Sequence, residues 1–138
     1  MNYLENFITF LTTGSHPTDV TYSPEIESEL QQEFQTCIDV TLDIEAKNIQ
    51  TAIKETDTEK IVTCTADFIW VFQVNGEFME VPGVEESKKP RQITEHGGVF
   101  TFTIDKASNT VIYVKETIAG NSYGKKSKRR GLFSALFT

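Results

Sequence analysis

Cysteine is scarce in this chain, since Cys37 and Cys64 are the two cysteines among 138 residues. Two cysteines cannot make the framework of several disulfides that stabilises many small secreted domains. They are also far apart in the sequence and have no histidine beside them, which excludes a zinc site of the usual spacing. Glycine-rich phosphate loops and Gly-x-Ser-x-Gly motifs are absent too, which excludes nucleotide-binding and serine-hydrolase functions that depend on them. We therefore expect a reduced, intracellular protein with no metal and no cofactor.

Long apolar runs are also missing. No stretch of the sequence approaches the ~20 consecutive apolar residues of a membrane-spanning helix. The first six residues contain no Lys or Arg, and no small-residue cleavage site follows them, so we expect no signal peptide. These absences favour a cytoplasmic location.

Positive charge is scarce over most of the chain. Residues 1–124 contain eight Lys and Arg against twenty Asp and Glu, a formal charge of -12, whereas residues 125–138 contain five basic residues and no acidic residue. We do not expect residues 1–124 to bind nucleic acid, because phosphate contacts need clustered Lys and Arg. The contrast divides the chain into one domain, residues 1–124, and a basic and amphipathic tail, residues 125–138.

The composition is that of a folded protein, with 38% hydrophobic residues, 24% charged residues and ten Phe. Two helices are expected first. Residues 3–12 place apolar side chains at helical spacing and end before Gly14, a residue that often follows a helix. Residues 24–35 repeat apolar side chains every four residues, after Ser23 as N-cap and with Pro24 in the first turn.

The period of the apolar residues then changes from helical to two. Residues 38–46 alternate apolar and polar side chains, which predicts a strand with one buried face. Residues 49–54 either continue that strand or form a separate segment. Further strands are expected at residues 60–74, 77–81, 92–105 and 110–118, with a hairpin turn at Asn75-Gly76. The sequence thus predicts an α+β domain in which two helices precede five or six antiparallel strands.

Three segments carry a resemblance to a known family: residues 66–70 (ADFIW), 97–104 (GGVFTFTI) and 111–118 (VIYVKETI). Together with the order of elements over residues 3–119, they resemble the SnoaL-like branch of the nuclear-transport-factor-2-like superfamily. The resemblance implies a cystatin-like cone, in which a curved antiparallel sheet wraps around two helices and encloses a hydrophobic pocket. Members include cofactor-free cyclases, dehydratases, isomerases and epoxide hydrolases, and also non-catalytic binding modules. The acid that follows the family's strand-ending Glu is missing after Glu116.

Aromatic residues gather on one face of the expected sheet. We predict that Phe68, Trp70, Phe72, Phe100 and Phe102 line a ligand pocket on the concave face, because small-molecule sites are largely apolar. The alternative is that these residues simply fill the space between sheet and helices, as aromatics at period two commonly do.

Three titratable residues are candidates for acid–base catalysis. Glu116 lies on the apolar face of its strand, where burial would raise its pKa, unless it lies in water at a frayed strand end. His96 alternates in phase with Phe100 and so points into the cavity, unless a bulge at Gly97-Gly98 reverses it. Asp19, between the two helices, is either a polar group of the pocket or a turn residue.

The tail combines a basic run with apolar residues. Its basic residues are Lys125, Lys126, Lys128, Arg129 and Arg130. A run of this kind resembles a nuclear-localisation signal and equally a patch for an anionic membrane surface. We predict a targeting tail that contacts such a membrane, an import receptor or the acidic domain of its own chain, with a nuclear location as the alternative to the cytoplasm.

We therefore expect a SnoaL-like pocket protein that binds a small apolar ligand or a protein partner without catalysis. The alternative is a cofactor-independent dehydratase, isomerase or cyclase that acts on a small hydrophobic or polyketide-like substrate. The opposite face of the sheet is partly apolar as well, which predicts a homodimer through that face. Its residues are Ile69, Val71, Val99 and Val111, with Asp67 facing solvent or the partner.

Overall fold

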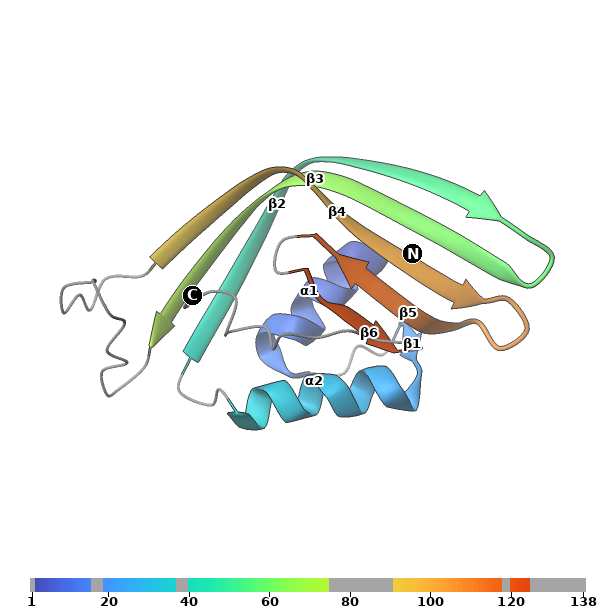
Figure 1. The fold of residues 1–138 in the computed structure, drawn as a ribbon, viewed down its shortest axis with the longest axis horizontal. Coiled ribbons are helices and arrows are strands. Elements are labelled where there is room, and N and C mark those ends of the chain that lie inside the picture. Colours follow the sequence, from blue (N-terminus) through green and yellow to red (C-terminus); the bar gives the residue numbers. More distant parts are fainter. Residues whose placement is uncertain (1, 16–18, 37–39, 75–90, 118–119, 125–138) are drawn as a thin grey trace.

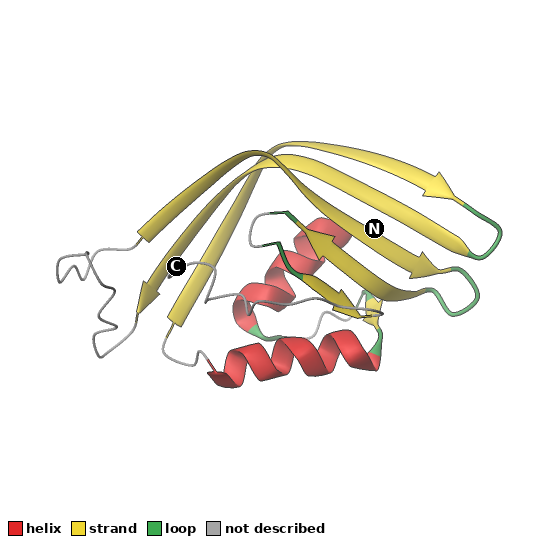
Figure 2. Cartoon of the chain, viewed as in Figure 1, coloured by secondary structure: helices red, strands yellow, loops and turns green. Residues whose placement is uncertain are grey.

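The computed structural model describes residues 2–15, 19–36, 40–74, 91–117 and 120–124. Its architecture is α+β, with two helices near the N-terminus and a six-stranded sheet (Figures 1 and 2). The elements are α1 (Tyr3–Thr13), β1 (Thr21–Tyr22), α2 (Pro24–Thr36), β2 (Val40–Glu55), β3 (Glu59–Val74), β4 (Arg91–Asp105), β5 (Thr110–Glu116) and β6 (Ser122–Gly124). The expected strand at 77–81, the turn before it and the tail lie outside the described residues.

Both predicted helices are confirmed. α1 begins where Asn2 Oδ1 accepts a hydrogen bond from Glu5 N at 3.0 Å, and it ends at Gly14, which has a left-handed backbone. α2 begins after Ser23, whose Oγ accepts a hydrogen bond from Ile26 N at 3.4 Å. These caps satisfy backbone groups that have no partner inside the helix, which explains the two starting points.

The sheet has the order β1-β5-β4-β3-β2, and β6 pairs with the end of β5. As predicted, residues 40–46 of β2 lie antiparallel beside β3. The prediction of a wholly antiparallel sheet was wrong, because β1 runs parallel to β5, with Tyr22 opposite Val111. The sheet is therefore mixed and mostly antiparallel. The two elements that the sequence did not reveal, β1 and β6, have two and three residues, too few for an alternating pattern.

Two bulges lie at the level where the long strands bend (Figure 1). Asn48 and Ile49 of β2 occupy the place of one residue opposite Ala66 of β3. On the other side of β3, His96 and Gly97 of β4 lie together opposite Asp67. Asn48 has a φ of 55° and Gly97 a φ of 68°, a left-handed backbone that asparagine and glycine adopt most easily. Bulges bend a strand and increase its twist, so they account for the shape of the sheet.

Both helices lie on one side of the bent sheet (Figure 2). We call the face toward the helices the inner face and the opposite face the outer face. The core on the inner face is aromatic, with the Phe7 side chain of α1 at its centre. Its ring centroid lies 5.7 to 6.1 Å from those of Tyr22, Phe100, Phe102 and Tyr123. These contacts fix α1 against the sheet.

None of the helices in the described ranges combines the length and the apolar character that crossing a membrane requires.

Candidate functional site

The predicted aromatic wall lies on the inner face. Phe68, Trp70, Phe100 and Phe102 have 0% exposed surface, while the side chain of Phe72 lies outside the described part. The rings of Phe68 and Phe100 are 5.1 Å apart at their centroids. A Cβ on Gly98 would lie 2.6 Å from Phe68 Cδ2, so the Phe68 ring packs where only glycine leaves room. These four residues form packed core, and their role as a pocket wall stays a prediction.

Trp70 is the member of this wall that carries a polar atom. It lies beyond the bend in β3, with its Cα opposite those of Ile44 in β2 and Ile93 in β4. Its side chain is fully buried, yet within the described chain no atom accepts a hydrogen bond from the indole Nε1. Leaving a buried donor unsatisfied costs about 1–3 kcal/mol. A ligand with one acceptor atom in this apolar surrounding would remove that cost.

Glu116 is buried on the inner face. Its side chain is 1% exposed, and its Cα lies opposite that of Phe100. The expectation that it belongs to the apolar face is confirmed, and the alternative of a frayed end in water is wrong. Oε1 accepts a hydrogen bond from Asn121 N at 2.6 Å, and Glu116 N donates to Asn121 O at 3.0 Å. These bonds hold the chain between β5 and β6, which gives the carboxylate a structural role.

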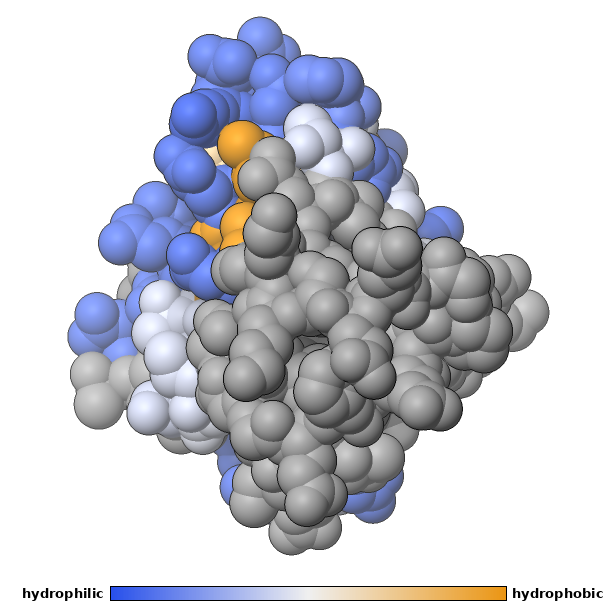
Figure 3. Space-filling model, turned by 90° about the vertical axis from the view of Figure 1, so that its left-hand side faces the viewer, coloured by the Kyte–Doolittle hydropathy of each residue, from blue (hydrophilic) through white to orange (hydrophobic). Residues whose placement is uncertain are grey.

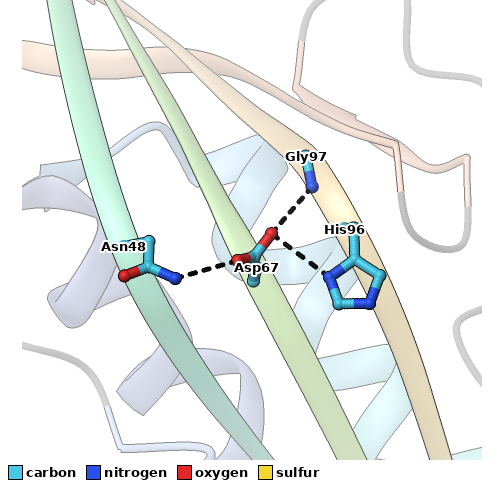
Figure 4. Close-up of polar contacts among 4 residues, drawn as sticks. All are labelled: Asn48, Asp67, His96 and Gly97. Atoms are coloured by element: carbon cyan, nitrogen blue, oxygen red, sulfur yellow. Dashed lines mark hydrogen bonds and ion pairs between the residues drawn. The ribbon is translucent and has the colours of Figure 1, made fainter.

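A polar cluster of three strands lies on the outer face at the bend (Figure 4). The Asp67 carboxylate accepts a hydrogen bond from Asn48 Nδ2 at 3.0 Å and another from Gly97 N at 3.1 Å. His96 Nδ1 lies 3.5 Å from Asp67 Oδ1. The hydrogen bond from the Asn48 amide holds the pKa of Asp67 below its ordinary value, and the hydrogen bond from the Gly97 N–H is the next largest cause. Asp67 thus joins the two bulges across β3.

The bulge at Gly97 decides the position of His96. It reverses the alternation of β4, so Phe100 faces inward while His96 faces outward with its side chain 82% exposed. Of the two alternatives that the sequence left open for His96, the inward one is wrong. Asp19 is exposed and precedes β1. The structure therefore does not gather the three catalytic candidates, since Glu116 is buried on the inner face and His96 lies exposed on the outer face.

Two other titratable groups are perturbed by burial. Burial raises the pKa of the Tyr22 phenol above its ordinary value, with a smaller contribution from Tyr3. Burial also raises the pKa of the Cys64 thiol, and the contact with Thr51 opposes this shift. Both groups therefore stay neutral near pH 7 and are poor nucleophiles. Among the residues that the structure describes, no group of three or more His, Cys, Asp or Glu could hold a metal ion.

The sequence did not reveal the roles of two asparagines, Asn121 beside Glu116 and Asn48 beside Asp67. Asn121 follows the last predicted strand, and its contact to Glu116 depends on β6, which has no periodic signal. Asn48 interrupts the alternation of its strand, and that interruption is the signal that could have indicated a bulge.

Comparisons with protein-family models, with curated proteins and with solved structures gave no significant match to this chain. The resemblance to the SnoaL-like branch therefore stays a prediction.

Proposed function

We propose that this protein is a non-catalytic binding domain of the SnoaL-like type, and that it takes a small apolar ligand between the bent sheet and the helices. The fully buried Trp70 indole carries this proposal, since its Nε1 has no acceptor among the described residues. Small-molecule sites combine apolar walls with a few polar groups that fix orientation. The chemistry of Trp70 selects a ligand with an apolar body and one acceptor, such as a carbonyl oxygen.

The placement of the polar residues supports binding rather than catalysis. General acid–base chemistry needs two groups that reach the same substrate. The outward-facing pair of Asp67 and His96 lies across the sheet from Trp70, and its contacts are explained by the bend. The Glu116 carboxylate is already engaged with the Asn121 backbone.

Native mass spectrometry of the purified full chain tests this proposal. We expect a discrete non-covalent adduct of a small apolar molecule in the wild type, which denaturation releases. Trp70→Phe keeps an aromatic ring and removes the donor, so its adduct should be much less populated. A wild-type protein without an adduct, whose melting temperature also stays constant across a library of apolar carbonyl compounds, would contradict the proposal.

A cofactor-independent dehydratase, isomerase or cyclase is the second candidate, and the observation that favours it is the buried Glu116 carboxylate opposite Phe100. Incubation of the bound molecule with the protein separates the two functions. A binding protein returns the molecule unchanged, whereas an enzyme returns a product. Glu116→Gln keeps an oxygen that accepts from Asn121 N, so in an enzyme this variant should retain the fold and lose turnover.

The basic tail is proposed to recruit the domain to an anionic surface. The tail follows directly after Gly124, whose backbone N donates to Glu29 Oε1 of α2 at 3.1 Å. This contact supports a competition in which the acidic surface of the domain and an external anionic surface both attract the tail. Removal of residues 125–138 should leave the unfolding transition unchanged and abolish binding to vesicles rich in phosphatidylserine. Binding of the full chain should weaken as salt rises. A truncated protein that fails to fold would contradict a separate targeting tail.

A further inference from the structure

β2 forms one edge of the sheet, and its second half is open to solvent. Within the described chain only β3 pairs with it. Every residue from 47 to 58 is exposed. Figure 1 shows this half of β2 projecting past both helices together with the turn that leads to β3. An exposed edge presents unpaired backbone N–H and C=O groups that can pair with another strand.

The exposed half of β2 also carries apolar side chains. Ile49 and Ile53 are 49% and 60% exposed, and they are the large exposed apolar residues of the described chain. Ile53 lies opposite Val62 and Thr51 opposite Cys64, two residues buried on the inner face. Ile49, Thr51 and Ile53 therefore form a row of β-branched side chains along the inner face of an open edge. On the face drawn in Figure 3 most of the described residues are hydrophilic, and a small group of apolar residues lies among them.

We propose that β2 pairs with β2 of a second copy of this chain, antiparallel and about a two-fold axis at Thr51. Residues that face one another in an antiparallel pair lie on the same face of the sheet. This register places Ile49 opposite Ile53 of the second copy, and Ile53 opposite Ile49. Thr51 meets its own symmetry mate. Pairs of β-branched residues of this kind are favourable across strands.

The alternative symmetric registers fit less well. An axis at Ala52 puts Ile49 opposite Glu55, and an axis at Ile53 puts Thr51 opposite Glu55. An axis at Gln50 pairs Ile49 with Thr51 and leaves Ile53 without an apolar partner. The register at Thr51 thus keeps the Glu55 carboxylate away from the row of β-branched side chains.

The positions of the charged side chains also favour the register with its axis at Thr51. Lys54 is the one charged residue between positions 48 and 54. The axis at Thr51 places it on the outer face opposite Asn48, whose side-chain amide donates to the Asp67 carboxylate. The ammonium of one copy thus approaches a carboxylate of the other, and no like charges face one another. The bulge at Asn48 ends the paired segment, as bulges commonly do.

The edge is a better surface for a second copy than the outer face that the sequence suggested. Val111 was expected on that face, but it is fully buried in the core because Ile112 bulges from β5. Ile69, Val71 and Val99 are on the outer face but only half-exposed. The apolar row of β2 is more exposed and belongs to an edge that can also form backbone hydrogen bonds.

Sedimentation velocity of the full chain at concentrations up to about 100 μM tests the proposal, since an interface of one strand pair lies at the small end of the size range. We expect a concentration-dependent monomer–dimer equilibrium. Ile53→Lys places an ammonium opposite Ile49 at two symmetric points and should raise the dissociation constant at least about tenfold. Ala52→Lys is the matched control, because Ala52 is exposed on the same strand but points to the outer face. It should dimerise like the wild type.

A cross-link tests the register itself. A mixture of the Ile49→Cys and Ile53→Cys variants should form a disulfide-linked dimer on mild oxidation, whereas either variant alone should not. The single-variant samples also control for the native cysteines. A wild type that stays monomeric, association beyond a dimer, or a dimer that Ile53→Lys leaves unchanged would overturn the proposal. Loss of the dimer in Val99→Lys with no effect of Ile53→Lys would assign it to the outer face instead.

Discussion

Asp67 and Phe68 are consecutive residues of β3, but they stand on opposite faces of the bend and have opposite environments. Asp67 holds the two flanking strands through Asn48 and the Gly97 backbone. Phe68 is fully buried against Phe100 and lies over Gly98. The comparison shows that apolar packing dominates the inner face, while polar contacts on the outer face connect the two bulges at which the sheet bends. The bulges also reverse the alternation on β2 and β4, which keeps most of the apolar side chains on the inner face on both sides of the bend.

The largest effect is expected from a deletion on the inner face. Trp70→Ala removes a fully buried aromatic side chain and should lower the free energy of unfolding by about 3–5 kcal/mol. Ile69→Ala, one residue away on the outer face, should cost about 1 kcal/mol. Chemical denaturation of both variants measures the difference. Equal losses would show that the two faces do not differ in packing at this position.

An intermediate effect is expected where the two faces meet, at the adjacent glycines of β4. Gly98→Ala pushes a Cβ into the Phe68 ring and should cost about 1–3 kcal/mol by overpacking. The Gly97→Ala methyl would have no atom within 4 Å, so its cost of about 1–2 kcal/mol comes from the positive φ alone. Denaturation curves should show that Gly97→Asn recovers much of the second loss, because asparagine adopts this backbone more easily. Equal stability of Gly97→Asn and Gly97→Ala would contradict the positive φ as the cause of the stability loss in Gly97→Ala.

The smallest effect is expected on the outer face and depends on pH. The pKa of Asp67 is lowered in the folded protein, so its ionised form stabilises the fold above the unfolded-state pKa of about 3.9. That contribution is lost as pH falls from this value through the lower folded-state pKa. Asp67→Asn lacks it, so its stability should depend less on pH in the acid range. Parallel curves for wild type and variant, from denaturation at several pH values, would contradict the role of the charge.

Much of the fold follows from periodicity in the sequence. The helical spacing of residues 3–12 and the period of two in residues 60–74 each extend over enough residues to determine one buried face. Burial of Phe68 and Trp70 follows from the pattern of residues 60–74, and burial of Phe100 and Glu116 follows from the period of two in their own strands, residues 92–105 and 110–118. The alternation fails at bulges, and for this reason Val111 was placed on the wrong face.

The polar contacts could be predicted less well. The Gly97-Gly98 pair indicated a reversed His96 as one of two alternatives, because glycines favour bulges, but it could not show that Asp67 would bind both bulges. That cluster depends on the register of three strands whose residues are 19 and 30 positions apart. Likewise, the contact of Glu116 with Asn121 requires β6, which is held by tertiary pairing and not by its own propensity.

The proposed binding role of the inner face is tested most directly at the indole of Trp70, which is the one tryptophan of the chain and gives a single indole N–H signal in a ¹H–¹⁵N spectrum. Acetophenone and ethylbenzene serve as probes, because they have similar apolar bodies and only the ketone carries an acceptor. The account predicts that acetophenone moves the indole proton signal downfield in a saturable way, and that ethylbenzene leaves it nearly unchanged. An indole signal that responds to neither probe, or equally to both, would contradict a ligand held by Trp70 Nε1.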